Sequence, residues 1–223
     1  MPDAEIEIID RLVSTLGLPT EFFRQLIRDV KESDWSFVIK LHALVEAALT
    51  HLLASTSPRP GVDTVYALLD TSDERTGKLA FVKALGLLSS DHRKYVKILG
   101  QIRNAFVHDV KNVGMTLSGY LDKQEKTKVG QFVEACALGM SKDYFEIRGK
   151  RIPKGKFFRE NPRLGLWLGG MTLLVEIYIQ REAVTLELDR GRVRNAFLKV
   201  IEPEVPPMTL RDLMSLGKKP AEQ

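Results

Sequence analysis

The chain has 223 residues, of which 44% are hydrophobic, so it can bury one good core or a core with an appendage. Its formal net charge of +4 is compatible with a nucleic-acid partner but too small to argue for one. The single cysteine excludes an intrachain disulfide framework, and acidic residues interrupt every early apolar stretch, so we expect no signal peptide and a cytoplasmic protein.

The first half of the chain predicts helices. Residues 1–32 predict two short N-terminal helices, at 4–16 and 21–31, separated by a Gly-Leu-Pro-Thr turn. A longer helix begins after Ser33, its expected N-cap, and runs to Leu53. Its apolar residues recur at helical spacing and predict a buried stripe of Val38, Leu41, Val45, Ala48, Leu49 and Leu52.

Four further helices follow in the pattern. Two, at about 76–88 and 90–107, are joined by a very short turn, and a third covers 126–140, where Cys136 has a packing role. The apolar run 164–175 is too short to span a bilayer, so we expect no membrane partner. Continued to residue 181, it predicts a core helix that partners the 90–107 helix, with close contact allowed by Gly165, Gly169 and Gly170.

These elements predict an all-α helical bundle. The expected domain covers 33–200, preceded by the N-terminal helices of 1–32 and followed by a C-terminal arm at 201–223. The arm is partly ordered in this interpretation and could dock on another subunit. We also expect a helical extension at the C-terminal end of the bundle.

The residues most informative about function are the sequence IRNAFVHD at 102–109, which ends the 90–107 helix. Arg103, Asn104 and His108 are groups that can cleave RNA without a metal. A neutral imidazole can exchange a proton with a ribose hydroxyl or a leaving oxygen, and a guanidinium can hold a phosphate. The apolar stripe of this helix consists of Tyr95, Leu99, Ile102 and Phe106.

The helical period separates these groups. Asn104 and His108 are i,i+4 neighbours on one face, whereas Arg103 leaves the helix roughly 140° from His108. The arginine must reach around, the last turn must loosen, or a two-fold partner must bring its own copy alongside. In a second interpretation, the trio merely caps the helix, because cations near a C-terminus favour the helix dipole.

The segment resembles the HEPN superfamily of small α-helical domains, whose motif is an arginine, an adjacent polar residue and a histidine a few positions later. Together with the flanking helices over about 33–112, it is closest to the mannitol-operon repressor-like branch. The resemblance implies Arg103, Asn104 and His108 as catalytic residues, with Asp109 in support. It also implies a polar residue from the earlier helix in the same groove, for which we choose Glu46; with His42 it could equally form an ordinary i,i+4 surface pair.

A basic run at 148–159 is the second candidate binding feature. It contains no acidic residue and predicts RNA contacts from Arg148, Lys150, Arg151, Lys154, Lys156, Phe157 and Arg159. The alternative is a solvated loop or a small β-hairpin, because residues 143–147 alternate like a strand and Gly149 could form the turn. Both interpretations, RNA contacts and an exposed hairpin, hold if the hairpin clamps RNA beside the Arg-Asn-His groove.

Three functions remain open at this point. The first is a metal-independent endoribonuclease, a toxin or defence effector, with RNA as substrate and an antitoxin as partner. The second is a regulatory binding protein of the repressor-like branch, and the third is a scaffold in which the trio pins a dimer interface. A homodimer is expected. His42, His51, Glu46 and His92 form no compact ligand spacing, so no metal or other cofactor is expected.

Overall fold

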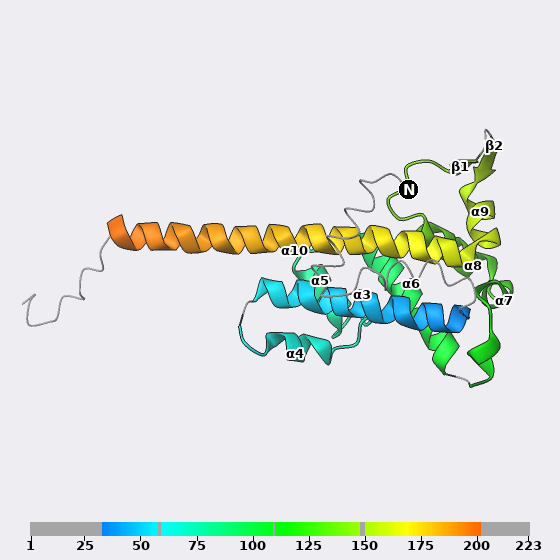
Figure 1. The fold of residues 1–223 in the computed structure, drawn as a ribbon, viewed down its shortest axis with the longest axis horizontal. Coiled ribbons are helices and arrows are strands. Elements are labelled where there is room, and N and C mark those ends of the chain that lie inside the picture. The colour runs from blue at the N-terminus through cyan, green and yellow to red at the C-terminus, as the bar shows by residue number, and fades with distance from the viewer. Residues whose placement is uncertain (1–32, 58, 109, 148–149, 202–223) are drawn as a thin grey trace, which may run out of the picture. The chain divides into compact units, whose positions relative to one another are not determined.

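The computed structural model describes residues 33–57, 59–108, 110–147 and 150–201. The helices expected at 4–16 and 21–31, and the arm beyond 201, lie outside these ranges. Within them the chain is helical apart from one two-stranded antiparallel sheet (Figure 1). The expected all-α fold with a small hairpin is confirmed.

The described elements follow one another with short connections. They are α3 (Asp34–Thr56), α4 (Val62–Ala67), α5 (Lys78–Ala84), α6 (Ser90–Val107), the 3-10 helix η1 (Val110–Gly114), α7 (Leu117–Asp122), α8 (Lys126–Cys136), β1 (Tyr144–Ile147), β2 (Lys150–Pro153), α9 (Lys154–Glu160) and α10 (Pro162–Ile201). α4, η1, α7 and α9 were not predicted. They are short helices without a long apolar period, which is the pattern that periodicity detects least well.

Two helices end earlier than the pattern predicts because glycine turns follow them. α5 stops at Ala84, where Gly86 takes a positive φ of 66°, and α8 stops at Cys136, ahead of Gly139 with a φ of 77°. A left-handed residue cannot continue a right-handed helix, and glycine adopts it without a Cβ clash. The short turn after α5 therefore leads directly into α6.

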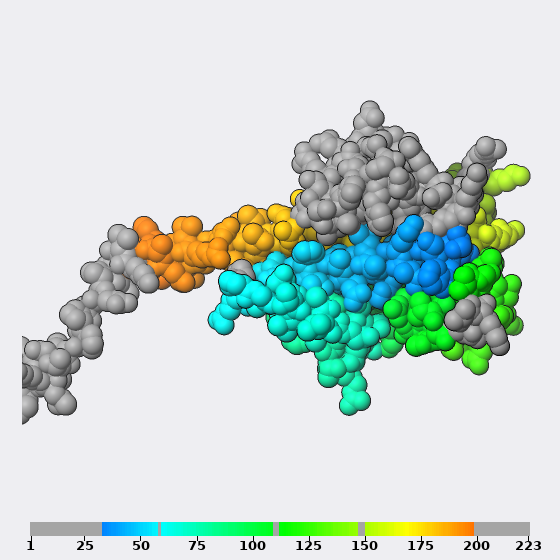
Figure 2. Space-filling model, turned by 60° about the horizontal axis from the view of Figure 1, so that its bottom comes forward, coloured from blue at the N-terminus to red at the C-terminus, as the bar shows by residue number. Residues whose placement is uncertain are grey.

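α3 and α6 form the centre of the bundle. Both have serine N-caps, with Ser33 accepting a hydrogen bond from the Ser36 N–H and Ser89 from the His92 N–H. The predicted stripes of both helices are buried. The Trp35 indole donates to the Phe106 carbonyl at 3.1 Å, so the start of α3 lies beside the end of α6. Figure 2 shows α3, in blue, with α4, in cyan, beside it.

The first half of α10 packs closely on α6, as expected. The Tyr95 hydroxyl donates to the Leu166 carbonyl, and a Cβ placed on Gly169 would lie 2.5 Å from the Tyr95 ring. A Cβ on Gly170 would lie 3.0 Å from Leu41 of α3. The two glycines leave room for a large aromatic side chain between helix backbones. The expectation of a core helix at 164–181 is therefore confirmed.

The compact unit ends at Glu182, earlier than the limit of 200 that the sequence suggested. α10 continues beyond this point to Ile201, and its residues from Ala183 onward belong to a second unit. Among the described helices, only α3 is long and apolar enough to cross a membrane. Since 56% of that apolar stretch is buried in the protein, α3 is a core helix of the bundle.

Replacing Gly169 with Ala tests the close contact between α10 and α6. Alanine is the better helix former, yet its Cβ would overlap the Tyr95 ring, so we expect Gly169→Ala to lower the free energy of unfolding by about 1–3 kcal/mol. Gly130→Ala in α8 is the matched control, because a Cβ there meets no atom within 4 Å. It should raise stability by up to about 1 kcal/mol. Denaturant titration measures the free energy of unfolding of both variants. Equal changes in the two would contradict the close contact between Gly169 and Tyr95.

Candidate nucleic-acid site at the end of α6

Two of the last carbonyls of α6 accept hydrogen bonds from side chains outside the Arg-Asn-His trio, while His108 is the C-cap residue, whose backbone N–H donates to the Asn104 carbonyl at 3.1 Å. Trp35 donates to the Phe106 carbonyl, and the Asn112 amide donates to the Ala105 carbonyl at 2.7 Å. Within the described residues, the side chains of Arg103 and His108 bond to neither carbonyl. The Ala105 and Phe106 carbonyls are therefore satisfied without the side chains of the trio, which weakens the interpretation of these side chains as caps.

Asn104 and His108 lie on the solvent face of α6. Their spacing continues a stripe of exposed side chains that alternates steps of three and four residues and consists of Lys94, Lys97, Gln101, Asn104 and His108. This alternation keeps all five on one side of a helix. The expectation that Asn104 and His108 share a face therefore agrees with the structure, and we call these five residues the α6 stripe.

Arg103 lies on the other flank of α6 and is half-buried. Its Nη1 donates to Oδ1 of Asn104 at 3.1 Å, and its positive charge is one of the groups that lower the pKa of His42 in α3. The guanidinium thus holds the oxygen end of the Asn104 amide. The nitrogen end of this amide keeps its donor capacity for a ligand. Within one chain, Arg103 is directed toward Asn104 and α3 instead of toward His108.

Glu46 belongs to a polar network between α3 and α5. Its Oε1 accepts hydrogen bonds from Thr71 at 2.8 Å and from Nζ of Lys78 at 3.1 Å, and Lys78 is fully buried. Lys78 also donates to the Leu69 carbonyl at 2.6 Å. On its other side, Glu46 Oε2 lies 4.0 Å from Nδ1 of His42. Glu46 therefore reaches the motif only indirectly, through His42 and Arg103, and not as a lining residue beside His108.

The environment shifts the pKa of both acid-base groups in this network downward. Burial is the largest cause for His42, and the charge of Arg103 adds to it, while Glu46 opposes the shift. For Glu46, burial acts to raise the pKa, but hydrogen bonds from Thr71 and Lys78 outweigh it. His42 is therefore held neutral and Glu46 charged near neutral pH.

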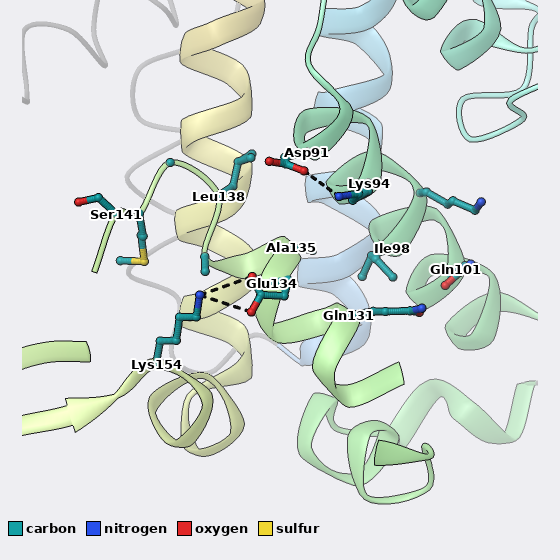
Figure 3. Close-up of a pocket in the computed structure, with 14 residues that line it drawn as sticks. Asp91, Lys94, Ile98, Gln101, Gln131, Glu134, Ala135, Leu138, Ser141 and Lys154 are labelled. Carbon is teal, nitrogen blue, oxygen red and sulfur yellow. Dashed lines mark hydrogen bonds and ion pairs between the residues drawn. The ribbon is translucent and has the colours of Figure 1, made fainter. Parts of the chain in front are cut away.

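The α6 stripe leads into a cleft of about 740 Å³ between α6 and α8 (Figure 3). Lys94, Lys97 and Gln101 line one side, and Glu134 and Lys154 belong to the other. In Figure 3 the ammonium of Lys154 points to Glu134, and Lys94 to Asp91. Sequence reasoning missed this cleft, although the three-and-four spacing of Lys94, Lys97 and Gln101 was a usable signal.

The basic run at 148–159 forms β2 and α9, with the hairpin expected as one alternative. β1 and β2 pair antiparallel, with Phe145 opposite Ile152. Phe157, expected to stack on a base, is only 9% exposed and lies with its ring centroid 4.0 Å from that of Phe145. Phe158 packs against both rings, so this aromatic cluster anchors the hairpin. Although lysines and arginines surround Phe157 in the sequence, its ring is buried in the hairpin cluster. Phe157 is therefore not available to stack on a base.

The cations of the run differ in their surroundings. Lys154 forms ion pairs with Asp143 at 3.1 Å and Glu134 at 3.4 Å, and the guanidinium of Arg151 lies 4.8 Å from the centroid of the Tyr144 ring. The three other described cations, Lys150, Lys156 and Arg159, are exposed, with Lys156 3.8 Å from Glu160. Arg148 and Asp109 lie outside the described residues. The exposed cations remain candidates for phosphate contacts.

No cluster of histidine, cysteine and carboxylate side chains able to hold a metal ion occurs in the part of the chain that the structure describes. Cys136 is buried, and burial raises the pKa of its thiol, as for a packing residue. Comparisons of the chain with models of protein families, with curated proteins and with solved structures found no match. The geometry of the site is therefore the basis for assigning a function.

The pKa shift of His42 predicts acid-sensitive stability. Because its pKa in the folded protein lies below the ordinary value of 6.5, the unfolded chain takes up the proton first, and stability falls as the pH drops below about 6.5. The corresponding loss from Glu46 begins only near its ordinary value of 4.5. Between pH 7.5 and 5.5 we expect His42→Gln to lose less thermal stability than the wild type. The exposed His51→Gln is the control, and identical pH slopes in all three proteins would refute the assignment.

Proposed function

We propose that the protein is a metal-independent endoribonuclease of the HEPN-like type that acts as a homodimer. The observation that carries this proposal is the exposure of Asn104 and His108 side by side at the end of the α6 stripe. A structural role would use the side chains of the trio to cap α6, but the Phe106 and Ala105 carbonyls are bound by Trp35 and Asn112, and His108 caps the helix through its backbone N–H alone. The polar trio is thus left with hydrogen-bonding capacity directed toward a ligand.

The chemistry follows from the residue types. His108 removes the proton from a ribose 2′-hydroxyl, the 2′-oxygen attacks the adjacent phosphorus, and the bond to the 5′-oxygen breaks. The leaving 5′-oxygen takes up a proton from an imidazolium or from water. The products are a 2′,3′-cyclic phosphate and a 5′-hydroxyl end. The amide nitrogen of Asn104 donates to a phosphate oxygen on the same face, where it supports the charge that develops during attack.

Arg103 enters this mechanism through the dimer. In one chain it is directed away from His108, so it stabilises the transition state most readily from a second copy related by a two-fold axis. Two such copies would surround one RNA groove with two sets of the trio. Within its own chain, Arg103 acts as a positioning residue because it holds the Asn104 amide at 3.1 Å.

Lysines of the α6 stripe provide a path for the RNA backbone. Lys94 is paired with Asp91 at 2.8 Å and Lys97 with Glu74 at 2.6 Å, and all four side chains are solvent-exposed. Exposed ion pairs contribute little free energy, so phosphates can replace the carboxylates at small cost. The exposed cations of the hairpin region, Lys150, Lys156 and Arg159, add a second set of phosphate contacts. A cytoplasmic toxin or defence effector with an antitoxin partner fits this activity.

Removing the imidazole should abolish cleavage without unfolding the protein. We expect His108→Ala to lower the cleavage rate of end-labelled RNA by at least about a hundredfold in excess chelator, since a positioned acid-base group contributes that much. His51→Ala, an exposed histidine on α3, is the matched control and should cleave normally. Mapping the ends of the products checks for the cyclic phosphate. Equal cleavage by both variants would overturn the role of His108.

Mixing two inactive variants tests the arginine in the second chain. In a dimer of one Arg103→Ala chain and one His108→Ala chain, one of the two sites keeps both groups if they come from different chains. An equal mixture should then recover activity, up to about a quarter of the wild-type value, because the chain that supplies His108 lacks the arginine that holds its own Asn104. If both groups act within one chain, every site is broken and the mixture stays inactive.

The second candidate is a non-catalytic regulatory protein of the mannitol-operon repressor-like branch. The specific observation in its favour is the α6–α8 cleft, whose apolar floor at Ile98 and Leu138 is flanked by charged side chains, an arrangement suited to holding a ligand. In this case RNA or a nucleotide would bind without being cut. Binding that Lys97→Ala weakens, together with intact RNA for the wild type, would favour this candidate.

A further inference from the structure

The part of α10 beyond Glu182 presents an exposed apolar face. Leu186, Val193 and Phe197 are 60%, 71% and 63% exposed. The first two are separated by seven residues, and Phe197 follows Val193 by four, so the three lie along one side of the helix. The helix is drawn in orange at this end in Figures 1 and 2. Large apolar side chains at this spacing are typical of a helix that pairs with another helix.

The spacing assigns coiled-coil core positions. If Leu186 and Val193 occupy the d positions of consecutive heptads, the a positions fall on Ala183, Arg190 and Phe197. One of the core positions is therefore charged. The guanidinium of an arginine at such a position can reach solvent while its aliphatic stem covers an apolar neighbour. The heptad is thus compatible with a two-stranded pairing in which an arginine stem packs beside apolar residues at the centre.

Charge is distributed unevenly along the same segment. Acidic residues come first, at Glu187 and Asp189, and arginines follow at positions 190, 192 and 194. Asp189 and Arg192 pair with each other within the chain at 3.3 Å. Glu187 and Arg194 occupy the e positions beside the apolar face, and neither has an ion-pair partner among the described residues. The segment is therefore complementary to a copy of itself that runs in the opposite direction.

We propose that residues 183–198 of α10 form an antiparallel coiled coil with the same segment of a second copy of the chain. In the register that aligns a with d positions, Leu186 packs on Phe197 of the second copy, and Arg190 packs on Val193 of the second copy. The same register places Glu187 opposite Arg194 of the second copy, and the two-fold axis repeats each contact. One alignment thus satisfies the apolar face and the unpaired charges together.

A parallel pairing would also bury Leu186 and Val193, and it would place Asp189 beside Arg194 of the second copy. It would, however, place Arg190 against Arg190 at the same layer and Glu182 beside Glu187 of the second copy, so that like charges face each other at both places. Repulsion of this kind selects orientation even where the apolar contacts are similar. The antiparallel arrangement is independent of the proposed RNA chemistry, because it uses no residue of the trio or of the α6 stripe.

Charge reversal in the full-length chain tests the surface and its register. Sedimentation of the wild type should show a concentration-dependent dimer. Glu187→Arg alone should raise its dissociation constant at least about tenfold, and the double variant Glu187→Arg with Arg194→Glu should restore it, because the exchanged charges again face each other. Failure of the double variant to recover would overturn the register. A monomeric wild type, with the face covered by another part of the chain or by a different protein, would overturn the proposal.

Disulfide trapping tests the direction. An oxidised mixture of Leu186→Cys chains with Phe197→Cys chains should form a mixed dimer, whereas each variant alone should not cross-link; Cys136 is buried and stays out of the reaction. Cross-linking of Leu186→Cys with itself would show a parallel pair and overturn the proposal. A dimer that persists unchanged in Leu186→Asp would place the interface elsewhere and would also overturn it. RNA cleavage by the same variants separates this outcome from any failure of the nuclease proposal.

Discussion

The contact between Tyr95 and the glycines of α10 determines how α6 is oriented. A large aromatic side chain is buried where two helix backbones approach, and its hydroxyl is satisfied by the Leu166 carbonyl. Neither rotation of α6 nor a larger residue at Gly169 is compatible with this arrangement. Because the rotation of α6 about its axis is set in this way, Asn104 and His108 face solvent and Arg103 faces α3. The candidate site is thus a consequence of core packing on the opposite side of the same helix.

Polar groups between α3, α5 and α6 separate Arg103, which belongs to an internal network, from Asn104 and His108, which face solvent. The buried ammonium of Lys78 holds Glu46, and Glu46 lies beside His42, whose pKa responds in turn to Arg103. The ammonium of Lys78 is fully buried, so loss of the Glu46 carboxylate, which is 39% exposed, would leave this charge without its acidic partner. The arginine is therefore part of an internal network as well as of the motif. The exposed asparagine connects the two, since its amide oxygen accepts the hydrogen bond from Arg103.

α10 has different roles along its length. Up to Glu182 it is a core helix with buried glycines and leucines, and beyond that residue it carries an exposed apolar face with alternating blocks of charge. Both halves are helical, and the first half packs within the compact unit, while the second half belongs to a separate unit. The exposed apolar face of the second half therefore suits a partner outside the chain. Because acidic residues precede basic ones along this half, the partner that we propose is a second copy running in the opposite direction.

Local pattern determined much of this protein. The serine N-cap at residue 33 and the helical spacing of apolar residues predicted α3 and α6 with nearly correct ends, the 164–181 core helix, and the common face of Asn104 and His108, because these properties depend on neighbours within one or two turns. Tertiary structure decided what depends on distant residues. Phe157 is buried because Phe145 lies against it, Glu46 accepts a hydrogen bond from Lys78, and the Trp35 indole donates to the Phe106 carbonyl of α6. No local period encodes such contacts, since each joins segments that meet only when the chain has folded.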